Sequence, residues 1–322
     1  MNYKQLTSQQ RSQIFALLQR KTRKKEIAQI VGRSISTIYR ELKRNSTENG
    51  NYLWEKADAM ALERRKRTTS NKRLDELLVW RIRQMIIDDQ LSPEQIKGVL
   101  AKEDISVSIQ TIYNIIKADE SGELRKHCRH PNFKRRLKQE RKPTKATNIT
   151  NRTSIHDRPP EADGTRFGDW EMDLIVDSAQ HAILVLVERS TNFVMMERLK
   201  HGKKAQPLAK AVIRMLFPYR KTLRSITTDN GSEFADHLTI TKKLGVTVYF
   251  ADSYCSWQKG AVEHENKLIR QYIPKKSNFN DFSDQFIINV GRKLNLRPRK
   301  KLNFSTPKTE FFKQIAIFAL AS

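Results

Sequence analysis

Three acidic residues in the second half of the chain have the type and spacing expected of a divalent-metal site. Asp173 lies in the segment WEMDLIV and Asp229 lies in TDNGSEF. Glu263 follows Asp229 after a gap of 33 residues. Mg²⁺ prefers hard oxygen ligands and leaves open positions for water and phosphate. A pair of such ions can activate the attacking oxygen and stabilise the leaving oxygen of a phosphodiester. These carboxylates therefore indicate metal-dependent phosphodiester chemistry.

The segments around these acids predict an α/β layer fold with a mixed sheet. Apolar and β-branched residues predict strands over 171–177, 181–189 and 193–199. The elements expected after them are a helix over 205–217, a strand over 224–228, a helix over 232–244, a strand over 246–250 and a helix over 258–272. This is the element order of the ribonuclease-H-like fold. It allows Asp173, Asp229 and Glu263 to meet at one end of the sheet.

Other acids compete for the first position. An isolated Asp within a strand is unfavourable, so Asp173 needs a reason to be there. Successive side chains of a strand alternate between the two faces of the sheet, which puts Asp169, Glu171 and Asp177 on the face of Asp173. Periodicity alone therefore cannot choose among these four residues.

The third acid is also contested, because Glu265 stands two residues after Glu263. Two residues are about 200° apart around a helix, so only one of the pair can face the site. We favour Glu263, because Arg270 lies seven residues later on the same face and can hold a DNA backbone beside the metals. The same offset from Glu265 leads to Tyr272. The candidate DNA contacts on this helix are Lys259, Lys267 and Arg270.

The charge balance indicates a polyanionic partner. The net charge is +26, and the surplus is larger in the first half of the chain. Neutralising DNA phosphates releases counterions, which favours binding by such a chain. An anionic membrane is another candidate partner, but no apolar run reaches transmembrane length and no signal peptide opens the chain.

Cys128 and Cys255 form no closely spaced pair, as in a reducing compartment. We expect no membrane association and a cytoplasmic, nucleoid-associated protein.

The first 120 residues predict two similar helical units. In the first, Thr7 caps a helix, a short helix covers 24–30, Gly32 breaks the chain, and another helix covers 34–45. In the second, Ser92 caps a helix and a further helix covers 108–117. Helix, tight turn and helix is the helix-turn-helix pattern, whose second helix enters the DNA major groove. Two ordinary helical hairpins are the alternative. The candidate DNA contacts are Arg33, Ser36, Thr37, Arg40, Lys43 and Arg44 in the first unit, and Gln110, Thr111 and Asn114 in the second.

Four regions follow from these elements. Residues 1–50 form the first helix-turn-helix module, and residues 51–123 hold a connecting helix over 52–78 and the second module. Residues 124–163 are expected to be a basic linker, with its most basic and apolar-poor part over 125–158. Residues 164–322 are expected to form the catalytic core with a C-terminal helical extension.

The chain resembles the insertion-sequence-thirty family of bacterial DDE transposases along nearly its whole length. The resemblance is carried by residues 170–175, 228–234 and 257–275, by 294–300 and by the two helical units. The gap of 33 residues matches the family's spacing and supports Glu263 over Glu265. Val262, His264 and Glu265 depart from the family's usual run at this point, which affects details of DNA contact.

This resemblance implies a retroviral-integrase-like core with catalytic Asp173, Asp229 and Glu263. It implies Mg²⁺ or Mn²⁺, two ions in all, held by the same residues. It also implies cutting and joining of DNA at terminal inverted repeats, insertion into target DNA through a circular form, and a homo-oligomer on paired ends. Two other functions stay open. One is a domesticated DNA-binding regulator that no longer cuts, and the other is a structure-selective nuclease of the same fold.

Overall fold

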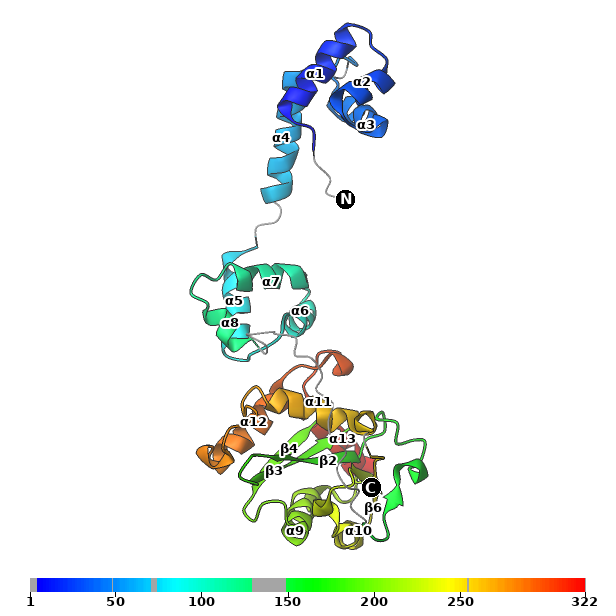
Figure 1. Ribbon diagram of the computed structural model, residues 1–322, viewed down its shortest axis with the longest axis vertical. Coiled ribbons are helices and arrows are strands. Elements are labelled where there is room, and N and C mark those ends of the chain that lie inside the picture. Colours follow the sequence, from blue (N-terminus) through cyan, green and yellow to red (C-terminus); the bar gives the residue numbers. More distant parts are fainter. Residues whose placement is uncertain (1–4, 48, 71–73, 129–148, 254, 322) are drawn as a thin grey trace. The chain divides into compact units, whose positions relative to one another are not determined.

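A computed structural model describes residues 5–47, 49–70, 74–128, 149–253 and 255–321 of the chain (Figure 1). The chain divides into two compact units, 1–78 and 79–322. The first unit is helical. The second contains a further helical module and a mixed sheet with helices on both faces.

The first unit contains helices α1 (Ser8–Gln19), α2 (Lys24–Val31), α3 (Ile35–Asn45) and α4 (Trp54–Ser70). Thr7 and Gln10 form the expected capping box at the start of α1. Gly32 ends α2 with a φ of 66°, a left-handed conformation that glycine adopts without steric cost. The buried guanidinium of Arg11 on α1 pairs with Glu41 of α3 at 2.7 Å and with Asp58 of α4 at 2.8 Å. One buried cation therefore joins three helices.

The helical module that follows contains α5 (Glu76–Ile87), α6 (Pro93–Ala101), α7 (Ile109–Lys117) and α8 (Glu123–His127). Ser92 and Gln95 form a capping box at the start of α6. The start of α7 repeats that of α3 residue by residue. The shared features are a Ser cap bonded to the Thr three residues later, a fully buried Ile and a half-exposed Tyr: Ser34, Thr37, Ile38 and Tyr39 in α3, and Ser108, Thr111, Ile112 and Tyr113 in α7. The expected equivalence of the two units is thus present in the local structure.

The sheet has six strands in the order β1-β6-β5-β2-β3-β4. Their bounds are β1 (Thr153–Ser154), β2 (Asp169–Val176), β3 (Ala182–Glu188), β4 (Val194–Leu199), β5 (Ser225–Thr228) and β6 (Thr247–Phe250). The pairs β2–β3 and β3–β4 are antiparallel, whereas β5 is parallel to both β2 and β6. This is the mixed sheet that the sequence predicted, and the parallel β2–β5 pair brings the segments of two candidate acids side by side.

Helices cover both faces of this sheet (Figure 1). On one face, α9 (Ala205–Leu216) and α10 (His237–Leu244) pack against apolar side chains of β2 such as Trp170 and Met172. On the other face, α11 (Gly260–Ile269) and α12 (Asp284–Leu296) pack against Ile175 and the alternate residues of β3. The alternation along β2 therefore turns its acidic side chains toward α11.

Several element boundaries differ from the sequence-based expectations. The helix expected over 52–78 is two helices, α4 and α5. The helices expected over 232–244 and 258–272 each begin as a short 3₁₀ turn, η3 (Ser232–Phe234) and η4 (Ser256–Lys259), before α10 and α11. Chains often enter helices through such turns.

The segment expected to be a linker, 124–163, differs at both of its ends. It contains most of α8, and it contains β1, which pairs in parallel with β6 through Thr153 and Ser154. Its middle, 129–148, lies outside the described residues. The C-terminal helix α13 (Pro307–Ala321) is part of the core, because the fully buried ring of Phe311 stacks on Phe193 at a centroid distance of 4.1 Å. Across the described residues, every helix is too short or too polar to cross a membrane.

Candidate active site

Asp173 and Asp229 meet where β2 and β5 run side by side. Asp173 lies within β2, and Asp229 directly follows Thr228, the last residue of β5. The Thr228 hydroxyl reaches the main-chain oxygen of Met172 at 3.4 Å, which keeps the two segments together. After Asp229 the chain turns sharply, and its carboxylate accepts the Gly231 N–H at 3.1 Å. The sequence-predicted convergence of these two acids is therefore present.

A single buried ammonium group joins the two carboxylates. Lys259 Nζ lies 3.4 Å from Asp173 Oδ1 and 3.1 Å from Asp229 Oδ2. Lys259 is only 4% exposed, although the sequence analysis assigned it to the DNA surface. In the structure its charge is directed into the acidic site, and its contact with DNA stays a prediction.

The other oxygen of Asp173 is held separately. Asn266 on α11 donates its amide N–H to Asp173 Oδ2 at 2.8 Å. Asn266 was missed as a site residue, and Lys259 was predicted to contact DNA rather than the aspartates. The signal was their spacing, because Lys259 stands four residues before Glu263 and Asn266 three residues after it. Such offsets place side chains on one face of a helix.

The electrostatics of the site favour a bound cation. Burial raises the pKa of the Asp173 carboxyl, and the nearby Asp229 adds to the rise. Burial opposes the charge on Lys259, but Asp173 and Asp229 outweigh it and hold the pKa of Lys259 above its usual value. Two negative charges this close repel each other, and a cation between them offsets the repulsion. The pair Asp173 and Asp229 thus has the donor set and the charge to hold a metal ion.

Glu263 and Glu265 point to different surroundings. Glu265 is fully buried and pairs with Arg299 at 2.9 Å, on the side of α11 that faces the chain beyond α12. Glu263 lies in the first turn of α11 and is half-buried. The ion pair of Glu265 accounts for its carboxylate and leaves Glu263 as the candidate third acid.

Glu263 is nevertheless not gathered with the two aspartates. Among the described residues, no three or more His, Cys, Asp or Glu side chains form a group that could hold a metal ion. The structure thus brings Asp173 and Asp229 together, whereas the role of Glu263 stays a prediction.

The acids that competed with Asp173 have structural partners. Asp169 is fully buried and pairs with Arg166 at 2.8 Å. Glu171 pairs with Arg189 at 2.9 Å and also accepts the Val262 N–H at the start of α11 at 2.9 Å. Asp177 accepts the Phe279 N–H at 2.8 Å and binds His181. These contacts hold the sheet and its loops together, which separates these acids from Asp173.

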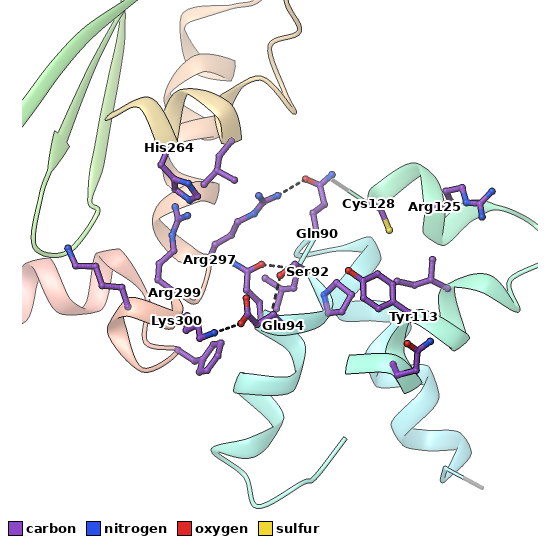
Figure 2. A pocket seen from close by; sticks show the side chains of 18 of the residues that line it. Gln90, Ser92, Glu94, Tyr113, Arg125, Cys128, His264, Arg297, Arg299 and Lys300 are labelled. Atoms are coloured by element: carbon purple, nitrogen blue, oxygen red, sulfur yellow. Dashed lines mark hydrogen bonds and ion pairs between the residues drawn. The ribbon is translucent and has the colours of Figure 1, made fainter. Parts of the chain in front are cut away.

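A cavity of about 920 Å³ lies between the α6–α8 module and the segment that follows α12 (Figure 2). One wall carries Gln110, Tyr113, Asn114 and Lys117 of α7. The opposite wall includes His264, which directly follows Glu263 on α11. Contacts across it include Gln95 to the Pro298 main-chain oxygen at 2.8 Å and Lys300 to Glu94 at 2.6 Å. Basic side chains dominate its charged lining: Lys117, Arg125, Arg297, Arg299, Lys300 and Lys301, against the single acid Glu94.

The first-unit DNA candidates divide into surface and structural residues. Exposed side chains on α3 are Ser36, Arg40, Lys43 and Arg44. Thr37 is half-buried and bonds to the Ser34 cap. Arg33 lies before α3 rather than on it, and donates to the Gln5 main-chain oxygen and to Gln10, each at 3.1 Å. These contacts hold Arg33 within the first unit, and its role in DNA binding stays a prediction.

The remaining candidates lie on α7 and α11. Gln110 and Asn114 are exposed on α7 and bond to each other at 3.0 Å, and Thr111 is half-buried. Lys267 is exposed on α11. Arg270 ends this helix half-buried, where burial lowers the pKa of its guanidinium and its N–H groups approach the main-chain oxygens of residues 273 and 274.

Comparisons with known proteins match both parts of the chain. Residues 2–45 match the family described as "Helix-turn-helix domain", and residues 166–256 match "Integrase core domain". The chain is 40% identical over 321 residues to "Transposase for insertion sequence element IS4351" of Bacteroides fragilis, which covers 97% of this chain and 96% of that protein. It is 33% identical over 332 residues to "Transposase InsI for insertion sequence element IS30A" of Escherichia coli (strain K12), which covers 97% and 84%. The catalytic core domain of BIV integrase is a similar solved structure, with 20% identity, 47% of this chain and 98% of that chain covered, and a TM-score of 0.39.

Proposed function

Because this chain belongs to the family of insertion-sequence transposases that includes those of IS4351 and IS30A, we propose that it cuts and joins DNA at the terminal inverted repeats of its own element. It is a DDE transposase with a helix-turn-helix DNA-binding domain and an integrase core domain. The observation that carries the proposal is the convergence of Asp173 and Asp229 on one cation. The net charge of the chain, +26, favours binding to DNA, because DNA is a polyanion.

The acids act by holding divalent metal. Asp173 and Asp229 would hold Mg²⁺ or Mn²⁺, and Glu263 would complete a site for two ions. Such metals activate an attacking oxygen and stabilise a leaving oxygen. Asn266 fixes the orientation of the Asp173 carboxylate through its 2.8 Å hydrogen bond.

The chemistry needs no covalent bond between protein and DNA. Water attacks the phosphorus at the element end, the P–O bond breaks, and the strand leaves with a free 3′-hydroxyl. That hydroxyl then attacks a phosphodiester of the target strand in line, and the target strand's 3′-oxygen leaves as the old P–O bond breaks. Asp173 and Asp229 would hold the metal that positions the reacting phosphate for this displacement.

DNA recognition is assigned to α3 and α7, each with its exposed polar and basic face in a major groove. The basic cavity beside α7 would take a segment of the DNA backbone, because its charged lining is almost entirely cationic. We further propose that a homo-oligomer assembles on paired ends. The DNA substrate implies action on the bacterial nucleoid in the cytoplasm.

The direct test is incubation of the purified chain and Mg²⁺ with DNA that carries the element's own ends, followed by sequencing of the products. A transposase yields joins between those ends and new DNA. End binding without any cut strand would indicate the regulator, and cuts without end-specific joining would indicate the nuclease.

Arg44→Ala is expected to weaken binding to the element ends and to flatten its salt dependence. Arg44 is exposed in the last turn of α3, on the helix assigned to the major groove. Loss of one contact reduces the slope of log K against log salt by about 0.9. Fluorescence anisotropy over a salt series measures this. Arg20→Ala, an equal charge change at the exposed end of α1, is the control and should leave the slope unchanged. Equal slopes for both variants would refute the assignment of α3.

Lys117 and Arg125 offer a matching test for the cavity. Replacing both by Ala should lower affinity for the element ends about tenfold or more, because two phosphate contacts are lost beside α7. Lys126→Ala is the control, since Lys126 neighbours Arg125 but pairs with Glu123 at 2.8 Å and does not line the cavity. If the double variant bound the ends as tightly as Lys126→Ala does, DNA would not enter this cavity.

A further inference from the structure

Lys259 contacts both aspartates of the candidate active site, and the proposed chemistry gives it no step of its own. It stands at the junction of η4 and α11, one helical turn before Glu263. The residue is 4% exposed, and its ammonium bonds to one oxygen of each aspartate. Burying an ammonium is costly unless carboxylates compensate for the lost water. The acidic pair therefore accounts for the burial of the Lys259 ammonium.

We propose that Lys259 acts as an internal counter-cation that occupies the metal position of Asp173 and Asp229 and has to leave before a divalent ion binds there. This inference rests on the proposed metal-dependent function and deepens it. The two cations would use the same carboxylate oxygens. Mg²⁺ lies about 2.0–2.1 Å from its oxygen ligands. This is closer than Lys259 Nζ, which lies 3.1 Å and 3.4 Å from these oxygens. The metal ion and the Lys259 ammonium are both positive, and their repulsion prevents both from occupying this position together.

The exchange has two consequences. In the metal-free protein, Lys259 keeps two like charges together, so the acidic pair stays assembled before metal arrives. After metal binds, the ammonium is released on a flexible four-carbon stem at the start of α11. It is then free to meet a DNA phosphate, which is the contact that the sequence suggested for it. Lys259 is a positioning residue in this scheme, since it acts through the two aspartates.

Chemical labelling of lysine amines tests the exchange on the unmodified full-length chain. An acylating ester is added with and without saturating Mn²⁺, and the label on each lysine is measured by mass spectrometry. We expect Lys259 to be protected without metal and labelled about tenfold faster with it, the scale of a typical coupling between two ligands. Lys242, exposed on α10 at the opposite face of the sheet, is the internal control and should not respond.

Metal affinity gives the second measurement. Lys259→Met keeps a long side chain but removes the competing charge, so Mn²⁺ should bind about tenfold more tightly, as measured by electron paramagnetic resonance of the free ion. Lys267→Met removes an exposed charge from the same helix and should leave the affinity unchanged. Asp173→Asn should abolish this binding in both backgrounds, which locates the measured site.

The outcomes separate the inference from the function beneath it. If the parent binds Mn²⁺ while Lys259 labelling stays constant, or if Lys259→Met binds Mn²⁺ no more tightly than the parent, the counter-cation role is overturned and the metal-dependent function stands. If neither the parent nor Lys259→Met binds Mn²⁺ at all, the proposed metal site is overturned together with the inference.

Discussion

Asp173→Asn should abolish both cutting and joining at the element ends while end binding stays intact. Asparagine keeps the size of the side chain but lacks the charge that holds the metal. Metal coordination stabilises the transition state by several kcal/mol, and about 1.4 kcal/mol corresponds to tenfold in rate. The expected loss is therefore about a thousandfold or more. Product formation on labelled element ends, together with a binding titration, measures both properties.

Asp229→Asn and Glu263→Gln should behave in the same way, and Glu263→Gln is the more informative of the two. The structure brings the aspartates together but does not gather Glu263 with them. Glu265→Gln is the matched control, with the same chemical change two residues away on the same helix. Strong cleavage by Glu263→Gln, with none by a folded Glu265→Gln, would show that the third acid has been assigned to the wrong residue.

The two aspartates could be located from the sequence because their positions depend on local strand patterns. Asp173 interrupts an apolar strand, and Asp229 follows a short strand at a tight turn. The parallel pairing of β2 with β5 then brings them together. Adjacent strands of this kind lie roughly 4.8 Å apart, so neighbouring strands suffice to gather the two side chains.

Lys259 could not be placed in the same way. A lysine near DNA-binding segments is normally solvated, and its long stem can reach several surroundings. Its destination depends on how α11 docks on the sheet, through contacts such as the Val262 N–H to Glu171. The strand β1 was also missed, because a strand of two residues is too short to show a periodic pattern. Only its pairing with β6 identifies it as a strand.

Helical geometry alone could not decide between Glu263 and Glu265. The angle between the two side chains shows that only one can face the site, but not which one. The partner that decides it, Arg299, lies 34 residues beyond Glu265. No local pattern relates these two positions, so the pair becomes visible only when the segment after α12 folds back onto α11.

Glu265→Ala should be among the most destabilising single changes in the 79–322 unit. Glu265 and its partner Arg299 are both buried, and the guanidinium lies 2.9 Å from the carboxylate. Removing one member of a buried ion pair leaves the other charge desolvated, which costs about 3–5 kcal/mol. Thermal unfolding followed by calorimetry should show a clear fall in the transition temperature of this unit. By contrast, Glu263→Ala should leave that temperature near the parent's, because Glu263 is only half-buried.

A double replacement separates the charge from the packing at this position. Glu265→Leu combined with Arg299→Met removes both charges and keeps much of the buried volume. Such replacements of a whole buried pair are often close to neutral for stability. The double variant should therefore recover most of the loss seen for Glu265→Ala, and it should still cut DNA, because Glu265 holds α11 to the segment around Arg299 rather than holding metal. A stable double variant that binds the element ends as the parent does but cuts no DNA would instead place Glu265 in the chemistry.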